Sequence, residues 1–288
     1  MTRSRWAFLL VSGLVAGLAL MENAAAAEWW TVRDPSRGPA ETMGSPVAGC
    51  ISGAEALPLD GPGYQVVRVS RNRYYGHPRL IRFVRSFGLA LERAGIGPVY
   101  VGDLSQPRGG PLTFGHASHQ NGLDADIWFT LAAKPRKAPT EREDVDTPSL
   151  VAAGGLDVER GMWREDHRRM LELAARDDEV ERIFVNPAIK RHLCRTVTGE
   201  RSWLRRIRPW YHHDAHFHVR LRCAPEDTLC VGGPPLPPGD GCDETLDRWL
   251  APGMRAVANQ AIKVKLTIPS RPSVIRKLPD ACRAVIKR

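Results

Sequence analysis

Histidines are concentrated in two short windows of this chain. Six of the nine lie within residues 115–126, which read GHASHQNGLDAD, and residues 210–218, which read WYHHDAHFH. Imidazole and carboxylate side chains bind divalent transition metals at neutral pH, and zinc is the usual occupant of mixed His/Asp sites. A catalytic zinc site needs three protein ligands and leaves a fourth position for water. The two windows therefore predict an open metal site.

Each window leads into a segment with the alternation of a β-strand. Residues 123–129 and 216–223 alternate between apolar and polar side chains, as half-buried strands do. The polar faces carry Asp124, Asp126 and Trp128 in the first segment, and His216, His218, Arg220 and Arg222 in the second. If the two strands are neighbours, these faces converge on one side of a sheet.

One metal ion could then be held by His119, Asp126 and His218. Gly122 permits the turn that brings His119 back toward Asp126. His216 and His218 lie roughly 7 Å apart along one strand face. That spacing suits one ligand and one neighbour that contacts water or substrate.

The candidate general base is also a histidine. Neither window contains a glutamate, and the H-E-x-x-H helix of many metalloproteases is absent. His213 or His216 therefore remains for the proton transfer, and the residue types do not choose between them. Arg220 and Arg222 could meet a substrate carboxylate or simply be solvated.

Two interpretations without catalysis stay open at this point. A pair of histidines on a strand is more often a surface or packing feature than a metal site. A structural zinc is the other alternative, but structural sites favour closed, cysteine-rich ligand sets. Two windows with matched polar faces favour the open site.

The N-terminus has the organisation of a signal peptide over residues 1–27. Arg3 and Arg5 are followed by an apolar run over residues 7–20 and by four alanines at 24–27. The alternative is an uncleaved anchor, but the apolar run is short for a bilayer crossing. We expect residues 28–288 to form one exported domain, with no stable membrane insertion after signal removal.

Charge and cysteine content agree with export. The net charge of +9 is spread along the chain, without the basic tracts or interleaved aromatics of nucleic-acid binding, so an anionic wall polymer is the more natural partner. The six cysteines lack C-x-x-C spacing, and disulfides are the default in an oxidising compartment. Spacing leaves their pairing open, although Cys223 and Cys230 could close a small loop.

The remaining pattern indicates an α+β fold. Leu80, Val84, Phe87 and Leu91 recur at helical spacing and Gly95 ends that helix. Further elements are expected as strands at 98–101 and 182–185, a helix over 164–177, and a short helix beginning at Asn186-Pro187. Residues 28–70 look irregular, the chain after Val231 is rich in Gly and Pro, and the part after residue 252 is basic and poorly patterned. We expect a central antiparallel sheet that carries the zinc site, flanked by helices and long disulfide-tied loops.

Longer blocks of the sequence resemble a known family. They read RYYGHP at 73–78, HASHQ at 116–120, GLD at 122–124, RIFVNPAIK at 182–190, RPW at 208–210, AH at 215–216 and HVRLRC at 218–223. In these blocks the chain resembles the penicillin-insensitive murein endopeptidases, periplasmic zinc peptidases related to the lysostaphin, D-Ala-D-Ala peptidase and Hedgehog-domain group. The resemblance covers essentially the whole mature chain.

The resemblance implies a set of site residues. Zinc is expected on His119, Asp126 and His218, with His116 close to the metal or among its ligands, and catalytic roles are expected for His213 and His216. The implied disulfides are Cys50–Cys282, Cys194–Cys242 and Cys223–Cys230. The first would close nearly the whole mature chain, which corresponds to a stabilisation on the order of 5 kcal/mol. A second metal contact of some members falls at Gly154 and Asp157 and is not carried over.

The resemblance also implies a reaction and a compartment. The substrate would be the cross-link between D-alanine and meso-diaminopimelate in peptidoglycan, hydrolysed in the periplasm by zinc-activated water whose pKa is about 7. Penicillin would not inhibit such an enzyme, because it has no serine nucleophile to acylate. The alternatives are a related D-Ala-D-Ala dipeptidase or carboxypeptidase, or a wall-binding module without activity. Retention of His213 and His216 with every ligand argues against the module.

Overall fold

A seven-stranded sheet forms the centre of the protein. The computed structural model describes residues 28–254 and 277–287, so the expected signal peptide over 1–27 lies outside the described residues. The sheet has the order β10-β9-β11-β8-β7-β5-β4. Its strands are β4 (Asp60–Gly61), β5 (Tyr64–Val66), β7 (Val99–Val101), β8 (Asp124–Leu131), β9 (Val180–Val185), β10 (Ile207–Pro209) and β11 (His216–Leu221). The four central strands pair antiparallel, as expected, whereas β10–β9 and β5–β7 are parallel.

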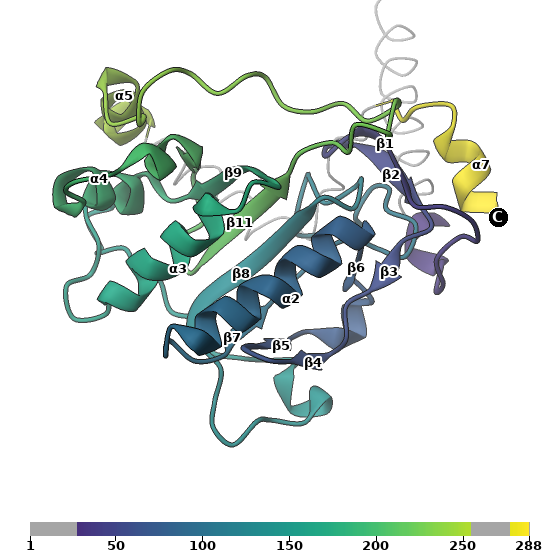
Figure 1. Ribbon diagram of the computed structural model, residues 1–288, viewed down its shortest axis with the longest axis horizontal. Helices are drawn as coiled ribbons and strands as arrows, with labels where there is room; N and C mark the ends of the chain where they lie inside the picture. Colours follow the sequence, from purple (N-terminus) through teal and green to yellow (C-terminus); the bar gives the residue numbers. More distant parts are fainter. Residues whose placement is uncertain (1–27, 255–276, 288) are drawn as a thin grey trace, which may run out of the picture.

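Two helices cover one face of the sheet (Figure 1). They are α2 (Pro78–Arg93) and α3 (Glu165–Arg176), which confirm the helices expected from periodicity to within two residues. The apolar stripe of α2 is buried, and Phe87 contacts Phe217 of β11 with ring centroids 6.2 Å apart. The apolar faces of β8 and β11 meet these helices, so the main core lies on this side of the sheet.

The opposite face of the central strands carries the polar side chains. β11 pairs with β8 so that His218 lies opposite Asp126 and His216 lies opposite Trp128. The expected convergence of the two polar faces is confirmed. The expectation of half-buried strands is wrong for β8, however, because its first six residues are buried on both faces.

Residues 28–70 are more regular than expected. They contain β1 (Glu41–Ser45) and β2 (Ala48–Ser52), which form a hairpin, and β3 (Glu55–Ala56), which pairs with β6 (Tyr75–Gly76). β4 and β5 also lie here. Strands of two to five residues are too short to show a period, which is why the sequence pattern missed them.

Short helices complete the ends of the sheet. They are α4 (Pro187–Thr196), α5 (Glu244–Leu250), α7 (Cys282–Lys287) and the 3₁₀ turns η1 (Val69–Arg71), η2 (Pro139–Arg142) and η3 (Ser202–Arg206). Figure 1 shows α4 and α5 at one end of the molecule, and the β1–β2 hairpin with α7 at the other. In the described part of the chain, no helix has the length and apolar character needed to cross a bilayer.

Three disulfides tie the long loops to these elements. They are Cys50–Cys282, Cys194–Cys242 and Cys223–Cys230, the pairing that the family resemblance implies. Cys50–Cys282 attaches α7 to β2 inside a small apolar cluster that also contains Trp29 and Met43. The C-terminal helix therefore belongs to the folded domain although a long segment precedes it.

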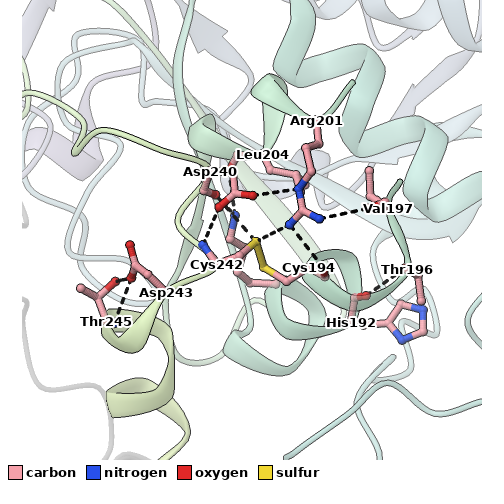
Figure 2. Close-up of a disulfide and its surroundings, with 11 residues drawn as sticks. His192, Cys194, Thr196, Val197, Arg201, Leu204, Asp240, Cys242, Asp243 and Thr245 are labelled. Atoms are coloured by element: carbon pink, nitrogen blue, oxygen red, sulfur yellow. Dashed lines mark hydrogen bonds and ion pairs between the residues drawn. A yellow bond between two sulfur atoms is a disulfide. The ribbon is translucent and has the colours of Figure 1, made fainter. Parts of the chain in front are cut away.

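The Cys194–Cys242 bridge holds the loop before α5 against α4 (Figure 2). The Arg201 guanidinium donates to the Cys194 carbonyl and to Cys242 Sγ, and it forms an ion pair with Asp240 at 2.8 Å. The helix that follows brings Trp249 against Tyr211, with ring centroids 5.1 Å apart. The bridge thus supports the chain next to the second histidine window.

Removing this bridge should destabilise the protein more than removing the smallest one. Cys194 and Cys242 are 48 residues apart, which corresponds to about 4 kcal/mol of loop entropy, whereas the seven-residue separation of Cys223 and Cys230 corresponds to about 2 kcal/mol. Urea unfolding of the Cys194→Ala/Cys242→Ala and Cys223→Ala/Cys230→Ala variants measures both losses. Equal losses of unfolding free energy in the two variants, or a larger loss in the Cys223→Ala/Cys230→Ala variant, would contradict this prediction.

Candidate metal centre

The centre is built on one cross-strand pair of β8 and β11. Asp126 and His218 lie opposite each other in the register, and His218 Nδ1 is 3.2 Å from Asp126 Oδ1. Both side chains are almost completely buried. The pair therefore presents a carboxylate and an imidazole to the same point on the polar face.

His119 reaches this point from a turn that precedes β8. Its Nε2 lies 3.4 Å from Asp126 Oδ1, and its backbone N–H donates to Asp124 Oδ2. The turn uses left-handed backbone at Gly122, as expected, and also at His119 itself (φ 67°). A non-glycine residue in this conformation is uncommon, and such strain is typical of functional sites.

His116 belongs to the same group. Its Nε2 lies 3.4 Å from Asp126 Oδ2 and 3.4 Å from Asp103 Oδ2. Ligand atoms of His116, His119 and Asp126 all lie within 4.8 Å of one another, close enough to hold one metal ion. The His218 ring adjoins this group, with its centroid 4.6 Å from that of His119.

The unpartnered atoms of the group fit a metal ion. His119 is completely buried, yet neither ring nitrogen makes a hydrogen bond to any described residue, and the same holds for Asp126 Oδ1. Leaving buried polar atoms without partners costs about 1–3 kcal/mol each. A cation shared by these atoms would remove that cost, and their N and O donors suit a divalent transition metal.

The charges of the site favour a cation. Burial alone would raise the pKa of the Asp126 carboxyl, but His119, His116 and His216 lower it well below its usual range. Burial opposes protonation of His218 as well, yet Asp124 and Asp126 outweigh it and raise the pKa of this imidazole to about 9. The carboxylates thus attract positive charge to the point where the side chains converge.

His216 lies next to the metal group on the same strand face. Its ring centroid is 5.0 Å from that of Trp128, and its Nε2 is 3.7 Å from Asp126 Oδ2. The nitrogen is buried and makes no hydrogen bond to the described residues. His216 is therefore a neighbour of the group, two residues before His218 on the same strand face, as the spacing predicts.

His213 approaches His216 from the preceding turn, with ring centroids 5.0 Å apart. Its Nδ1 lies 2.9 Å from the Tyr211 carbonyl, which can only accept, so Nδ1 carries the proton and Nε2 is left as an acceptor. His212 and His213 both have positive φ. Asn186 holds this strained turn, because its backbone N–H donates to the His213 carbonyl and its side-chain amide to the His212 carbonyl.

Arg220 is engaged by a buried carboxylate of the neighbouring strand. It forms two hydrogen bonds to Asp124, at 2.7 and 2.9 Å, so it is neither solvated nor free to bind a substrate. Arg222 is exposed beyond the end of β11. Asp157 pairs with His192 at 3.2 Å and with Arg195 at 3.3 Å, so it is engaged away from this group.

Comparison with known proteins identifies the family. A family model described as penicillin-insensitive murein endopeptidase matches residues 42–287. The chain belongs to this family. Similar proteins of that name include one from Klebsiella pneumoniae, 41% identical over 96% of this chain and 97% of its own length. Others are from Haemophilus influenzae, 40% identical over 90% and 88%, and from Yersinia enterocolitica, 38% identical over 96% of each.

In this family member, two further buried carboxylates lie against the candidate metal group, and the sequence predicted no role for either. Asp124 lies 3.2 Å from His218 Nε2 and so orients the ring whose other nitrogen faces Asp126. Asp103 forms ion pairs with Arg71 and Arg73, and it lies 3.4 Å from His116 Nε2. The alternation of β8 placed Asp124 on the correct face, but Asp103 follows β7 in a loop with no pattern. Such outer partners fix the orientation of metal-binding histidines.

Metal affinity should rise with pH. Because the carboxylates raise the pKa of His218 to about 9, this ring carries a proton at pH 7 in the metal-free protein, and a metal that used His218 as a ligand would have to displace it. Below pH 9, metal binding therefore releases this proton, and the affinity rises as the pH rises. The affinity for Zn²⁺ should increase up to about tenfold per pH unit between pH 7 and pH 8.5. Competition with a chromophoric chelator measures this, with His192→Gln as the control outside the site. Affinity that does not change with pH would contradict the assignment.

Proposed function

We propose that this protein is a zinc-dependent murein endopeptidase that hydrolyses the D-alanyl–meso-diaminopimelyl cross-link of peptidoglycan. The observation that carries the proposal is the convergence of His116, His119 and Asp126. His218 lies opposite Asp126 in the strand register, and both His119 ring nitrogens and Asp126 Oδ1 lack hydrogen-bond partners among the described residues. Family membership and relatives named as murein endopeptidases support the choice of substrate.

Zinc is the metal that this donor set suits best. His119, Asp126 and His218 supply two imidazoles and one carboxylate, a combination typical of catalytic zinc, and His116 lies within reach of the same carboxylate. When bound, zinc would supply an activated water and polarise the scissile carbonyl. Asp124 and Asp103 would keep the rings of His218 and His116 in orientation.

His216 and His213 are the groups proposed for proton transfer. Burial lowers the pKa of His216 to about 4 and that of His213 to about 3, so both rings are neutral at neutral pH. One of them would take the proton of the attacking water and deliver it to the leaving amine, which becomes a free amino group. The fixed Nδ1–H of His213 leaves its Nε2 available for this exchange.

We infer that the protein works in the periplasm after its signal peptide, residues 1–27, is removed. The three disulfides support this location, because disulfides are typical of oxidising compartments, and peptidoglycan is the partner that the periplasm offers. Because a metal-assisted attack by water needs no serine nucleophile, penicillin has no group to acylate, in accord with the names of the relatives.

Digestion of purified muropeptides tests the function. The protein should convert cross-linked dimers to monomers, stop when a chelator removes the metal, and recover when Zn²⁺ is added back. Mass analysis of the products separates the alternatives. Release of D-alanine from monomers would indicate a carboxypeptidase, release of the D-Ala-D-Ala dipeptide a dipeptidase, and binding to sacculi with intact dimers a wall-binding module. Each of these three results contradicts the proposal.

Two single substitutions separate ligand from base. His218→Ala removes a metal ligand, so zinc content and activity should fall together. His216→Ala should keep most of the zinc while the rate falls about 100-fold or more, the usual scale for a general acid or base. Metal analysis and the rate of dimer cleavage measure both effects. If His216→Ala loses zinc as completely as His218→Ala, then His216 is itself a ligand.

A further inference from the structure

Arg68 is held in an unusual backbone conformation beside the metal centre. It follows β5 and precedes η1 with φ 57° and ψ 42°, in the left-handed region that residues other than glycine rarely adopt. Two hydrogen bonds secure it, because its N–H donates to the Arg142 carbonyl and its own carbonyl accepts from the Arg71 N–H, each at 3.0 Å. The strained position is therefore built into the fold.

The Arg68 side chain lies over the ring of Trp128. The Arg68 guanidinium carbon lies 4.7 Å from the centroid of the Trp128 ring. Trp128 is the residue opposite His216 in the β8–β11 register, and its ring also packs against that of His216, at 5.0 Å. Arg68 and the candidate base thus contact the same indole.

Arg68 differs from the other arginines around the centre. Arg71 and Arg73 form ion pairs with Asp103, and Arg220 with Asp124. Among the described residues, no carboxylate lies within ion-pair distance of Arg68, which is only partly exposed. Burial and the Arg71 charge lower the pKa of its guanidinium, but an arginine stays protonated at any physiological pH. Arg68 is therefore a fixed cation that stacks on Trp128 next to His216 and that, in the described part of the chain, has no carboxylate in ion-pair contact.

The proposed substrate carries an anion at a matching position. In the D-alanyl–meso-diaminopimelyl cross-link, the residue that leaves with the scissile nitrogen has a free carboxylate on the carbon next to that nitrogen. Ordinary bond lengths place this carboxylate carbon at most about 4 Å from the scissile carbon. The anion is therefore one carbon beyond the amine that must receive the proton.

The order of groups along the strands agrees with this substrate. The Asp126–His218 pair lies at one position, the Trp128–His216 pair roughly 7 Å further along the same face, and Arg68 over Trp128. We propose that Arg68 binds the free carboxylate of the leaving residue and so makes the enzyme specific for cross-links that carry this anion. This subsite rests on the proposed endopeptidase function.

A pair of matched substrates tests the subsite. One is the cross-linked dimer with the free carboxylate, and the other is the same dimer with that carboxylate converted to the amide. The wild-type protein should prefer the free acid by about 10- to 100-fold in kcat/KM, the effect of charge-assisted hydrogen bonds. Arg68→Met, which still packs on Trp128, should lose this preference by slowing only the free-acid reaction. The loss should fall mainly on KM, because the carboxylate is charged before and after bond cleavage.

Controls distinguish recognition from structural support. Arg68→Lys should restore part of the preference, since lysine keeps the charge but not the two-pronged geometry. Arg136→Met, at an exposed arginine away from the site, should behave as wild type. Equal losses on both substrates, or a wild-type protein that does not distinguish them, would overturn the subsite while the endopeptidase function stands. If the wild-type protein cleaves neither dimer, the endopeptidase function itself fails and the subsite falls with it.

Discussion

The register between β8 and β11 is the constraint on which the rest of the site depends. It places Asp126 opposite His218, Asp124 opposite Arg220 and Trp128 opposite His216. Side chains alternate along a strand, so a slip of one residue would turn the carboxylates and imidazoles into the core and the apolar side chains out of it. Phe217 and Val219, both completely buried under α2 and α3, secure the register from the other face. The hydrophobic core thus determines where the polar groups meet.

A second constraint follows from the burial of so many charges. An ionised carboxylate in a protein interior is unfavourable unless cations or hydrogen bonds compensate it. Asp124 is compensated by Arg220 and His218, and Asp103 by Arg71 and Arg73. Among the described residues, the ion-pair partners of Asp126 are all histidines. Asp124 and Asp103, whose charges are balanced by arginines, orient the neighbouring histidines. Asp126, which has no arginine partner among the described residues, lies where the metal is proposed to bind.

Unusual backbone conformations also occur around the centre. His119, His212, His213 and Arg68 all have positive φ without being glycine. Each is held by hydrogen bonds from neighbouring elements, such as those from Asn186 to the His212–His213 turn. Asn186 also caps α4 by accepting the N–H of Ala188, so one residue fixes both a helix start and a turn of the site. The turn that carries His212 and His213 is thus attached to the start of α4.

The amino-acid sequence by itself determined the features that depend on local periodicity and residue type. The helical spacing of Leu80 to Leu91 predicted α2, and the alternation of residues 216–223 predicted β11 with its histidines on one face. Only the tertiary structure decided which charged and aromatic side chains pair with one another. Arg220 pairs with Asp124 across 96 residues, Asp103 meets His116 from a loop without pattern, and Arg68 lies over Trp128 from a strained turn. These partners are distant along the chain, and such contacts leave no period in the sequence because the packing of the whole domain brings them together.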